Sequence, residues 1–104
     1  NYMKKQFKIF YTTIGSKKEA KIFSNKLLKN PDIICINIFT NVLSMYCDKN
    51  NTLEENETVL IIKTFLSEKE IKQMVLNYHP YNIPFLSRIN CNLLSDKYYK
   101  WAIK

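Results

Sequence analysis

The sequence predicts an α+β fold with the element order β-α-β-β-α-β and a short additional helix at the end of the chain. Three observations support this prediction. Stretches rich in β-branched and aromatic residues, typical of strands, recur along the chain. Two amphipathic stretches lie between them, and each begins with a Ser-x-x-Glu capping box. The resulting order is the split βαβ arrangement of ferredoxin-like domains, and a chain of 104 residues forms one domain, 1–104.

The first predicted strand covers residues 5–13, KQFKIFYTT. Phe7, Ile9 and Tyr11 alternate along it and therefore share one face. Gly15, the only glycine in the chain, ends this strand. Glycine is the residue that most readily adopts a positive φ, so we expect a turn of that kind at this position.

The two main helices are predicted over about residues 17–29 and 68–78, where apolar residues recur at helical spacing. Their capping boxes pair a serine with a glutamate three residues later: Ser16 with Glu19, and Ser67 with Glu70. The residue before a proline disfavours the α region. The first helix therefore ends at Asn30-Pro31 and the second at His79-Pro80.

The middle of the chain predicts long strands joined by a hairpin. Residues 33–39, IICINIF, form a nearly continuous apolar run that suits a central strand covered on both faces, and 42–47 continue in strand style. The polar, asparagine-rich segment 47–56 is predicted as the hairpin tip, and 58–65 as the returning strand. A short fourth strand is predicted over 85–91.

A last short helix follows, with Ser95 or Asp96 as its cap. Tyr98 and Trp101 lie three residues apart on this helix and therefore on one side of it. We expect these two aromatic side chains to hold the helix against a neighbouring subunit.

This arrangement leaves one face of the sheet without a cover. The two helices can cover only one face, yet the strands over 33–39 and 58–65 are apolar on both sides. An apolar face of that extent usually marks an interface. We therefore expect several copies of the chain to associate through their uncovered sheet faces.

The charge argues against a nucleic-acid partner although the formal net charge is +7. Fifteen of the sixteen cationic residues are lysines scattered along the chain, and Arg88 is the only arginine. Proteins that read bases and phosphates commonly use the planar fork of arginine. The chain also lacks a run of about 18 apolar residues, so we expect no membrane span.

The three cysteines, Cys35, Cys47 and Cys91, are an odd number without CxxC spacing. A secreted disulfide framework normally uses an even number, so a reducing cytoplasm is predicted. Cys35 and Cys91 lie on apolar strands and are expected to be buried, whereas Cys47 borders the polar hairpin and is expected to be exposed.

His79 is the only histidine, and three roles are open for it. It can act as a metal ligand with Cys35 and Cys47, in a copper site that bridges subunits, because copper(I) favours sulfur ligands. It can act as a general base, although the spacing shows no partner nucleophile. The third role is structural: His79 ends the second helix, where an imidazole meets the negative end of the helix dipole.

Glu57 and Lys63 lie six residues apart on one strand and therefore on the same face. Each can pair with an oppositely charged residue of another subunit, which would fix the register of assembly. The alternative is that Lys63 binds a small anion in a cleft. Nothing in the chain resembles a glycine-rich phosphate loop, so the ion pair is the favoured interpretation.

Five short motifs occur in the order and at nearly the spacing known from one family. They are CINI (35–38), SMY (44–46), ETVLIIKT (57–64), HPYNIP (79–84) and YxxW (98–101). With these motifs the chain resembles the divalent-cation tolerance protein CutA family over about residues 8–103. Two ligands possible in that family are missing here: Phe85 stands where a glutamate is usual, and residues 10–12 contain no cysteine.

The resemblance implies a compact homotrimer of ferredoxin-like protomers in which strands of neighbouring subunits extend each other's sheets. It implies a cytoplasmic protein that contributes to tolerance of copper or another divalent cation by binding or signalling, without catalysis. The alternatives are a trimer that senses a small molecule or anion, and a purely structural trimer that binds a partner protein. Residues expected at the clefts between subunits are Tyr46, Glu57, Lys63, Tyr81, Pro84 and Trp101.

Overall fold

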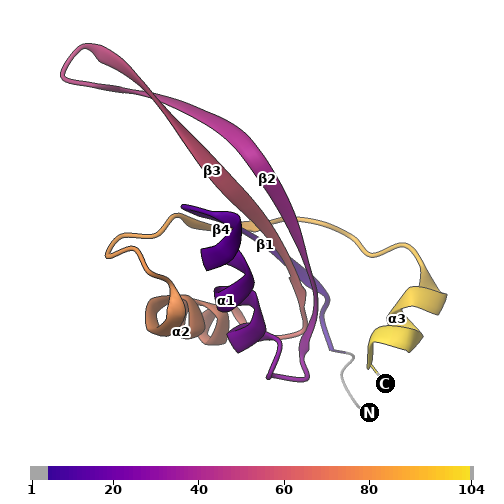
Figure 1. The fold of residues 1–104 in the computed structure, drawn as a ribbon. Coiled ribbons are helices and arrows are strands. Elements are labelled where there is room, and N and C mark those ends of the chain that lie inside the picture. The colour runs from indigo at the N-terminus through magenta and orange to yellow at the C-terminus, as the bar shows by residue number, and fades with distance from the viewer. Residues whose placement is uncertain (1–4, 104) are drawn as a thin grey trace.

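Four antiparallel strands form one sheet, and two helices cover one of its faces in the computed structural model, which describes residues 5–103 (Figure 1). The elements in chain order are β1 (Lys8–Ile14), α1 (Lys17–Leu27), β2 (Ile33–Asp48), β3 (Asn51–Thr64), α2 (Glu68–Tyr78), β4 (Leu86–Ile89) and α3 (Asp96–Ile103). The strands lie in the order β2-β3-β1-β4. The predicted α+β order of elements is thereby confirmed.

The hydrophobic core lies between the sheet and the two helices α1 and α2. On β3, Leu60 and Ile62 alternate with outward-facing residues and are fully buried, because β3 lies between β1 and β2. The core cluster consists of Phe10, Ile14, Ala20, Phe23, Leu27, Ile33, Leu60, Ile62, Leu66, Ile71 and Val75.

The opposite face of the sheet has no helix packed across its centre, and we call it the open face. Strand register and alternation assign it the following residues: Ile9, Tyr11, Cys35, Phe39, Val59, Ile61, Lys63 and Ile89, together with the polar residues Thr13, Asn37 and Ser87. Phe39 is 53% exposed there. The helix α3 lies on this side of the sheet, opposite α1 and α2, near one end of β1 (Figure 1).

The two helix starts differ in their hydrogen bonds. At α2 both bonds of the capping box form: the Glu70 amide donates to the Ser67 hydroxyl (3.1 Å), and the Ser67 amide donates to the Glu70 carboxylate (3.0 Å). At α1 the Glu19 amide donates to the Ser16 hydroxyl (3.2 Å), but the Glu19 carboxylate accepts from that same hydroxyl. The predicted reciprocal box is therefore complete only at α2.

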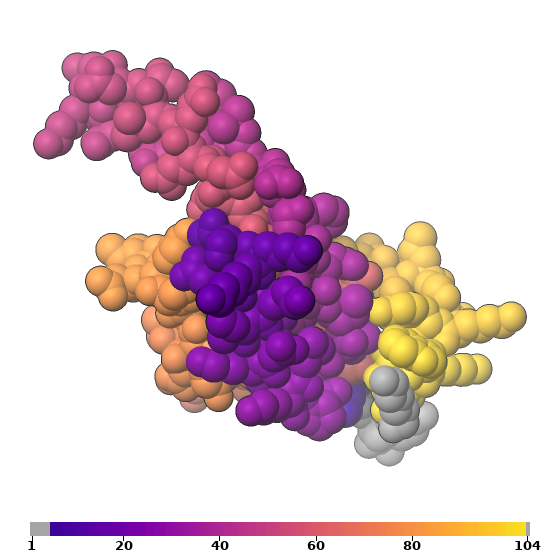
Figure 2. Space-filling model, in the orientation of Figure 1, coloured from indigo at the N-terminus to yellow at the C-terminus, as the bar shows by residue number. Residues whose placement is uncertain are grey.

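The predicted hairpin tip lies within 47–56, as expected, but its predicted extent is wrong, because β2 and β3 continue almost to the end of the hairpin. The turn contains only Lys49 and Asn50, both with positive φ (51° and 65°), as a two-residue type I′ turn requires. Cross-strand neighbours such as Tyr46 and Leu53 keep this polar segment in the strand conformation. The hairpin therefore projects from the body of the molecule (Figure 2). The whole molecule, hairpin included, measures 56 × 25 × 23 Å along its principal axes.

The strand β2 lies at the edge of the sheet, so the prediction of a central strand over 33–39 is also wrong. Its apolar side chains gave no information on edge or centre, because an apolar edge strand and a central strand share the same composition. A bulge interrupts the pairing of β2 with β3 between Phe39 and Val42, and Asn41 has a positive φ of 60° there.

Gly15 does not have a positive φ, contrary to the prediction. Its lack of a side chain matters for space instead. A Cβ atom at this position would lie 2.8 Å from a carboxylate oxygen of Glu19 and 3.3 Å from the Tyr81 hydroxyl. Gly15 therefore allows the start of α1 and the segment after α2 to approach each other.

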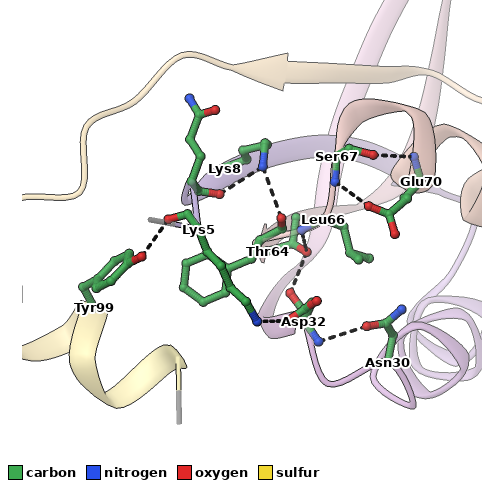
Figure 3. Close-up of polar contacts among 11 residues, drawn as sticks. Lys5, Lys8, Asn30, Asp32, Thr64, Leu66, Ser67, Glu70 and Tyr99 are labelled. Atoms are coloured by element: carbon green, nitrogen blue, oxygen red, sulfur yellow. Dashed lines mark hydrogen bonds and ion pairs between the residues drawn. The ribbon is translucent and has the colours of Figure 1, made fainter. Parts of the chain in front are cut away.

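Hydrogen bonds to backbone groups connect the N-terminal strand with the segment between β3 and α2 (Figure 3). The Lys8 ammonium, almost buried, donates to the carbonyls of Gln6 (3.0 Å) and Phe65 (3.2 Å). Burial lowers the pKa of Lys8. The Thr64 hydroxyl donates to the Asp32 carbonyl (2.7 Å) and accepts from the Leu66 amide (3.0 Å), which fixes the exit of β3.

Ser95, one of the two predicted caps, precedes α3, and its hydroxyl accepts from the Tyr98 amide (3.0 Å). The Tyr99 hydroxyl donates to the Lys5 carbonyl (2.8 Å; Figure 3). The Tyr99 ring also packs edge-on against Phe65 at 5.6 Å. These contacts join the C-terminal helix to the start of the chain.

The two caps generate a prediction about stability. We expect Ser67→Ala and Ser16→Ala each to lower the free energy of unfolding by about 0.5–2 kcal/mol. The reason is that each substitution removes the serine hydroxyl that accepts from the backbone amide three residues later. Urea denaturation at one protein concentration measures both values. Ser87→Ala, an exposed strand variant, is the control, and losses no larger than that of the control would contradict the prediction.

Candidate functional site

The His79 side chain occupies a structural position at the end of α2. Its backbone amide donates to the Val75 carbonyl (2.8 Å), so His79 is the C-cap of the helix. Its ring bridges two backbone groups: Nε2 donates to the Thr13 carbonyl (2.8 Å), and Nδ1 accepts from the Tyr81 amide (3.1 Å). These partners require the neutral ring with its proton on Nε2. The ring thus connects the end of β1 to the turn after α2.

Burial and aromatic packing hold this ring in place. His79 is 8% exposed, and its ring contacts Phe23 (5.4 Å between centroids) and Tyr81 (4.8 Å) edge-on. The sequence predicted that His79 ends the helix, which is confirmed, but it gave no sign of Thr13, whose contribution is a backbone carbonyl. A metal ion at either ring nitrogen would have to replace one of these two hydrogen bonds.

Tyr81 projects from the same turn toward the start of α1. Burial raises the pKa of its hydroxyl, and the carboxylates of Glu57 and Glu19 raise it further. Proton loss would place a further negative charge near these carboxylates, so the neutral hydroxyl is favoured. Pro84, which follows three residues later, is half-buried.

Glu57 and Lys63 both belong to the open-face side of β3 and are half-buried. Six residues of extended strand separate them by roughly 20 Å, so they cannot pair with each other in one chain. Within residues 5–103 no ion pair includes either of them. Among the described residues, neither charge therefore has a counter-charge in an ion pair.

The projecting hairpin carries Tyr46 and Cys47. The Tyr46 hydroxyl donates to the Glu55 carboxylate across the strands (2.8 Å). This hydrogen bond raises the pKa of Tyr46. Cys47 is exposed, as predicted, but Cys91 is also exposed, so its predicted burial is wrong. Cys91 lies in the irregular segment after β4 (Leu86–Ile89), beyond the pairing that would have buried it.

Trp101 lies on α3 and is 54% exposed. Its ring packs at 5.4 Å from that of Tyr98. Its exposed surface is available to another subunit.

The predicted metal ligands do not converge in one protomer. His79 lies at the end of α2, Cys35 on the open face and Cys47 near the hairpin turn. Among the residues described, no group of three or more His, Cys, Asp or Glu side chains is arranged to hold a metal ion. An ordered site with these ligands therefore requires side chains from more than one subunit.

The family assignment rests on most of the chain. Residues 8–104 match the family model described as CutA1 divalent ion tolerance protein. The chain belongs to the CutA1 family. Its curated relatives include the divalent-cation tolerance protein CutA of Thermococcus kodakarensis, which is 31% identical over 92% of each of the two chains.

Solved CutA1 structures have the same fold as this family member. Divalent ion tolerance protein CutA1 from Ehrlichia chaffeensis has a TM-score of 0.83 and 29% identity, and the match covers 97% of this chain and 95% of that one. CutA1 from Pyrococcus horikoshii has a TM-score of 0.80 and 30% identity, with coverage of 94% and 95%. The resemblance to CutA predicted from the sequence motifs is confirmed.

The names of other CutA relatives give different compartments. An Arabidopsis thaliana relative is named chloroplastic, and the Archaeoglobus fulgidus protein is named periplasmic. No helix formed by residues 5–103 has the length and apolar character needed to cross a membrane. The cytoplasmic location predicted from the cysteines stays a prediction.

The His79 geometry generates a prediction. We expect His79→Ala to lower the free energy of unfolding by about 2–4 kcal/mol, because the Thr13 carbonyl and the Tyr81 amide each lose their partner. Asn77→Ala, on the exposed side of α2, is the matched control and should change the value by less than about 0.5 kcal/mol. Urea denaturation provides the measurement, and a loss below about 1 kcal/mol for His79→Ala would show that the ring does not support this corner.

Proposed function

We propose that this protein acts as a cytoplasmic homotrimer in the response to divalent metal ions, copper among them, by binding or signalling and without catalysis. Membership of the CutA1 family supports the divalent-cation part of this proposal. The proposal of assembly rests on the open face, because this largely apolar surface is exposed to solvent in a single protomer.

The hairpin strengthens the argument for assembly. Leu43 and Met45 are 60% and 58% exposed on β2, although both side chains are apolar. The hairpin of β2 and β3 extends beyond α1 and α2 (Figure 1). Isolated soluble proteins rarely leave contiguous apolar surface of this kind exposed, and symmetric association is the common way to cover it. The number three follows from the CutA resemblance.

The absence of catalysis is supported by the state of the one histidine. A general base needs a ring nitrogen within reach of the proton that it removes. Both ring nitrogens of His79 are occupied by the backbone groups of Thr13 and Tyr81. The residue considered as a general base from the sequence thus uses both ring nitrogens in hydrogen bonds that stabilise the fold.

Metal binding in the trimer would use ligands from different subunits. The three cysteines are free thiols, and soft sulfur ligands suit copper(I). Cys47 projects on the hairpin of one protomer, where it can approach another protomer. A site shared between chains would link metal binding to assembly.

The assembly generates a prediction about mass. Light scattering should give three times the chain mass of 12.4 kDa for the wild type. Phe39→Glu places a charge in the apolar open face and should shift the mass toward the monomer. Leu76→Glu, at a residue that is 67% exposed on α2, is the matched control and should stay trimeric. A wild type that is monomeric at working concentration would overturn the proposed assembly.

Metal binding generates a second prediction. Calorimetric titration of the reduced wild type with copper(I), with copper(II) and zinc(II) in parallel, should show binding at micromolar concentration or tighter. Cys35→Ser and Cys47→Ser should each weaken copper(I) binding at least tenfold, because each removes a sulfur ligand. Cys91→Ser is the matched control. Absence of binding heat in the wild type, or equal weakening by Cys91→Ser, would contradict the predicted ligands.

A further inference from the structure

The helices α1 and α2 present a basic surface to solvent, on the side of the molecule away from the open face (Figure 1). We call it the outer helix surface, and its exposed cationic residues are Lys17, Lys18, Lys21, Lys26, Lys29, Lys69 and Lys72. Within residues 5–103 no ion pair includes any of these lysines. Because this surface lies opposite the open face, the assembly proposed above leaves it exposed.

The carboxylates of the two helices are engaged at the helix starts. Glu19 accepts from the Ser16 hydroxyl (3.2 Å), and Glu70 accepts from a backbone amide before α2 (3.0 Å; Figure 3). Glu68 accepts from the Arg88 guanidinium (2.9 Å). These three are the acidic residues of α1 and α2. The outer helix surface therefore has an excess of positive charge.

The hairpin carries the opposite charge. Residues 48–57 contain four acidic residues and one lysine, which gives a net charge of −3. Since the whole chain carries +7, the residues outside this segment carry +10. An anionic surface therefore attracts the helix side of the molecule and repels the end of the hairpin.

Exposed apolar side chains lie among the lysines on both helices. On α1, Ile22 is 50% exposed and lines a surface depression together with Lys18 and Lys21. On α2, Leu76 is 67% exposed and lines another depression with two lysines of that helix. The buried side chains of α1 lie on its opposite side, so Ile22 takes no part in the core. Each helix thus presents an apolar side chain that is flanked by lysines.

A tyrosine joins the two helices on this surface. Tyr78 is 40% exposed at the end of α2, and the Lys26 ammonium lies 5.7 Å from the centre of its ring. Ile22 lines the same depression as these two residues. Tyrosine is enriched where membranes meet water, because its ring is apolar and its hydroxyl is polar. Lysine suits the same place, since its stem can lie along apolar groups while its ammonium stays in water.

We propose that the outer helix surface docks on an anionic lipid membrane. The lysine ammonium groups meet the negatively charged lipid head groups, and Ile22, Leu76 and Tyr78 enter the head-group region. No helix formed by residues 5–103 can cross a membrane, so this contact is peripheral.

The distribution of the lysines favours a lipid surface over an acidic protein. They are spread over two helices and do not converge on one point, so an extended anionic surface meets more of them than one acidic peptide does. Attraction to many head groups requires charge but no planar fork, which fits the use of lysine here. The inference goes beyond the proposed metal response and does not rest on metal binding.

Co-sedimentation with lipid vesicles tests the proposal. Vesicles of phosphatidylcholine alone are compared with vesicles that also contain phosphatidylserine, at low ionic strength. The wild type should bind the phosphatidylserine vesicles at least about tenfold more strongly. This binding should fall steeply in about 1 M salt, where charges are screened beyond roughly 3 Å. Equal binding to both kinds of vesicle, or absence of binding to the anionic one, would overturn the proposal.

Two double variants remove the same charge from different places. Lys18→Gln with Lys21→Gln should weaken binding to phosphatidylserine vesicles at least about fivefold. Lys97→Gln with Lys100→Gln, at exposed lysines of α3, is the matched control and should retain binding. Equal weakening by the two double variants would show that net charge alone causes binding, and it would overturn docking through the outer helix surface.

The apolar contribution has its own test. Ile22→Ala should weaken binding to anionic vesicles at least about threefold, because it removes apolar area that enters the head-group region. Leu94→Ala, at a residue that is 89% exposed outside the helices, is the control and should bind as the wild type does. Unchanged binding by Ile22→Ala would contradict the proposed orientation on the membrane.

Polyglutamate and duplex DNA, titrated in the same buffer, represent an acidic protein and a nucleic acid. The wild type should bind phosphatidylserine vesicles more tightly than either polymer at equal concentration of negative charge, and Ile22→Ala should weaken vesicle binding alone. Tighter binding to a polymer would overturn the choice of a lipid surface.

Light scattering on the same samples separates this proposal from the proposed function. A monomeric wild type that binds anionic vesicles contradicts the trimer and supports the membrane surface. A trimeric wild type that binds no anionic vesicles overturns the membrane surface and leaves the proposed function intact.

Discussion

The alternation of side chains along β3 is the constraint on which the rest of the structure depends. Leu60 and Ile62 enter the core between the sheet and the helices, and neighbouring strands pair with β3 on both sides. The same alternation sends Ile61 and Lys63 to the other face, where no helix crosses the sheet. One strand thus both completes the core and creates the surface that carries Lys63. A change of register by one residue would exchange these two roles.

The structure separates the residues of the family motifs into two kinds. His79 supports the fold, since both nitrogens of its buried ring bond to backbone groups. Lys63 and Cys35, by contrast, face each other in register on the open face and remain accessible to another molecule. Their position favours this sheet face over the histidine corner as the place where the protein meets its partners.

The sequence allowed the order of elements, the helix α2 and its Ser67–Glu70 box to be predicted, because spacing and capping act over a few residues. The length of the hairpin could not be predicted, since cross-strand pairing overrides the polar composition of 47–56. The space required around Gly15 depends on Tyr81, which approaches from a distant part of the chain.

The bulge at Asn41 determines which side chains each face of the β2–β3 hairpin presents to neighbouring copies in the proposed assembly. An additional residue in β2 reverses the side of the ribbon on which later side chains lie. Phe39 therefore faces one way, whereas Leu43 and Met45 face the other. A single flat contact cannot cover both groups, so in the proposed assembly Phe39 and the Leu43–Met45 side of the hairpin would contact different surfaces. Contacts between two different surfaces form a ring where the rotation between copies closes, whereas a twofold pair uses the same surface of both copies.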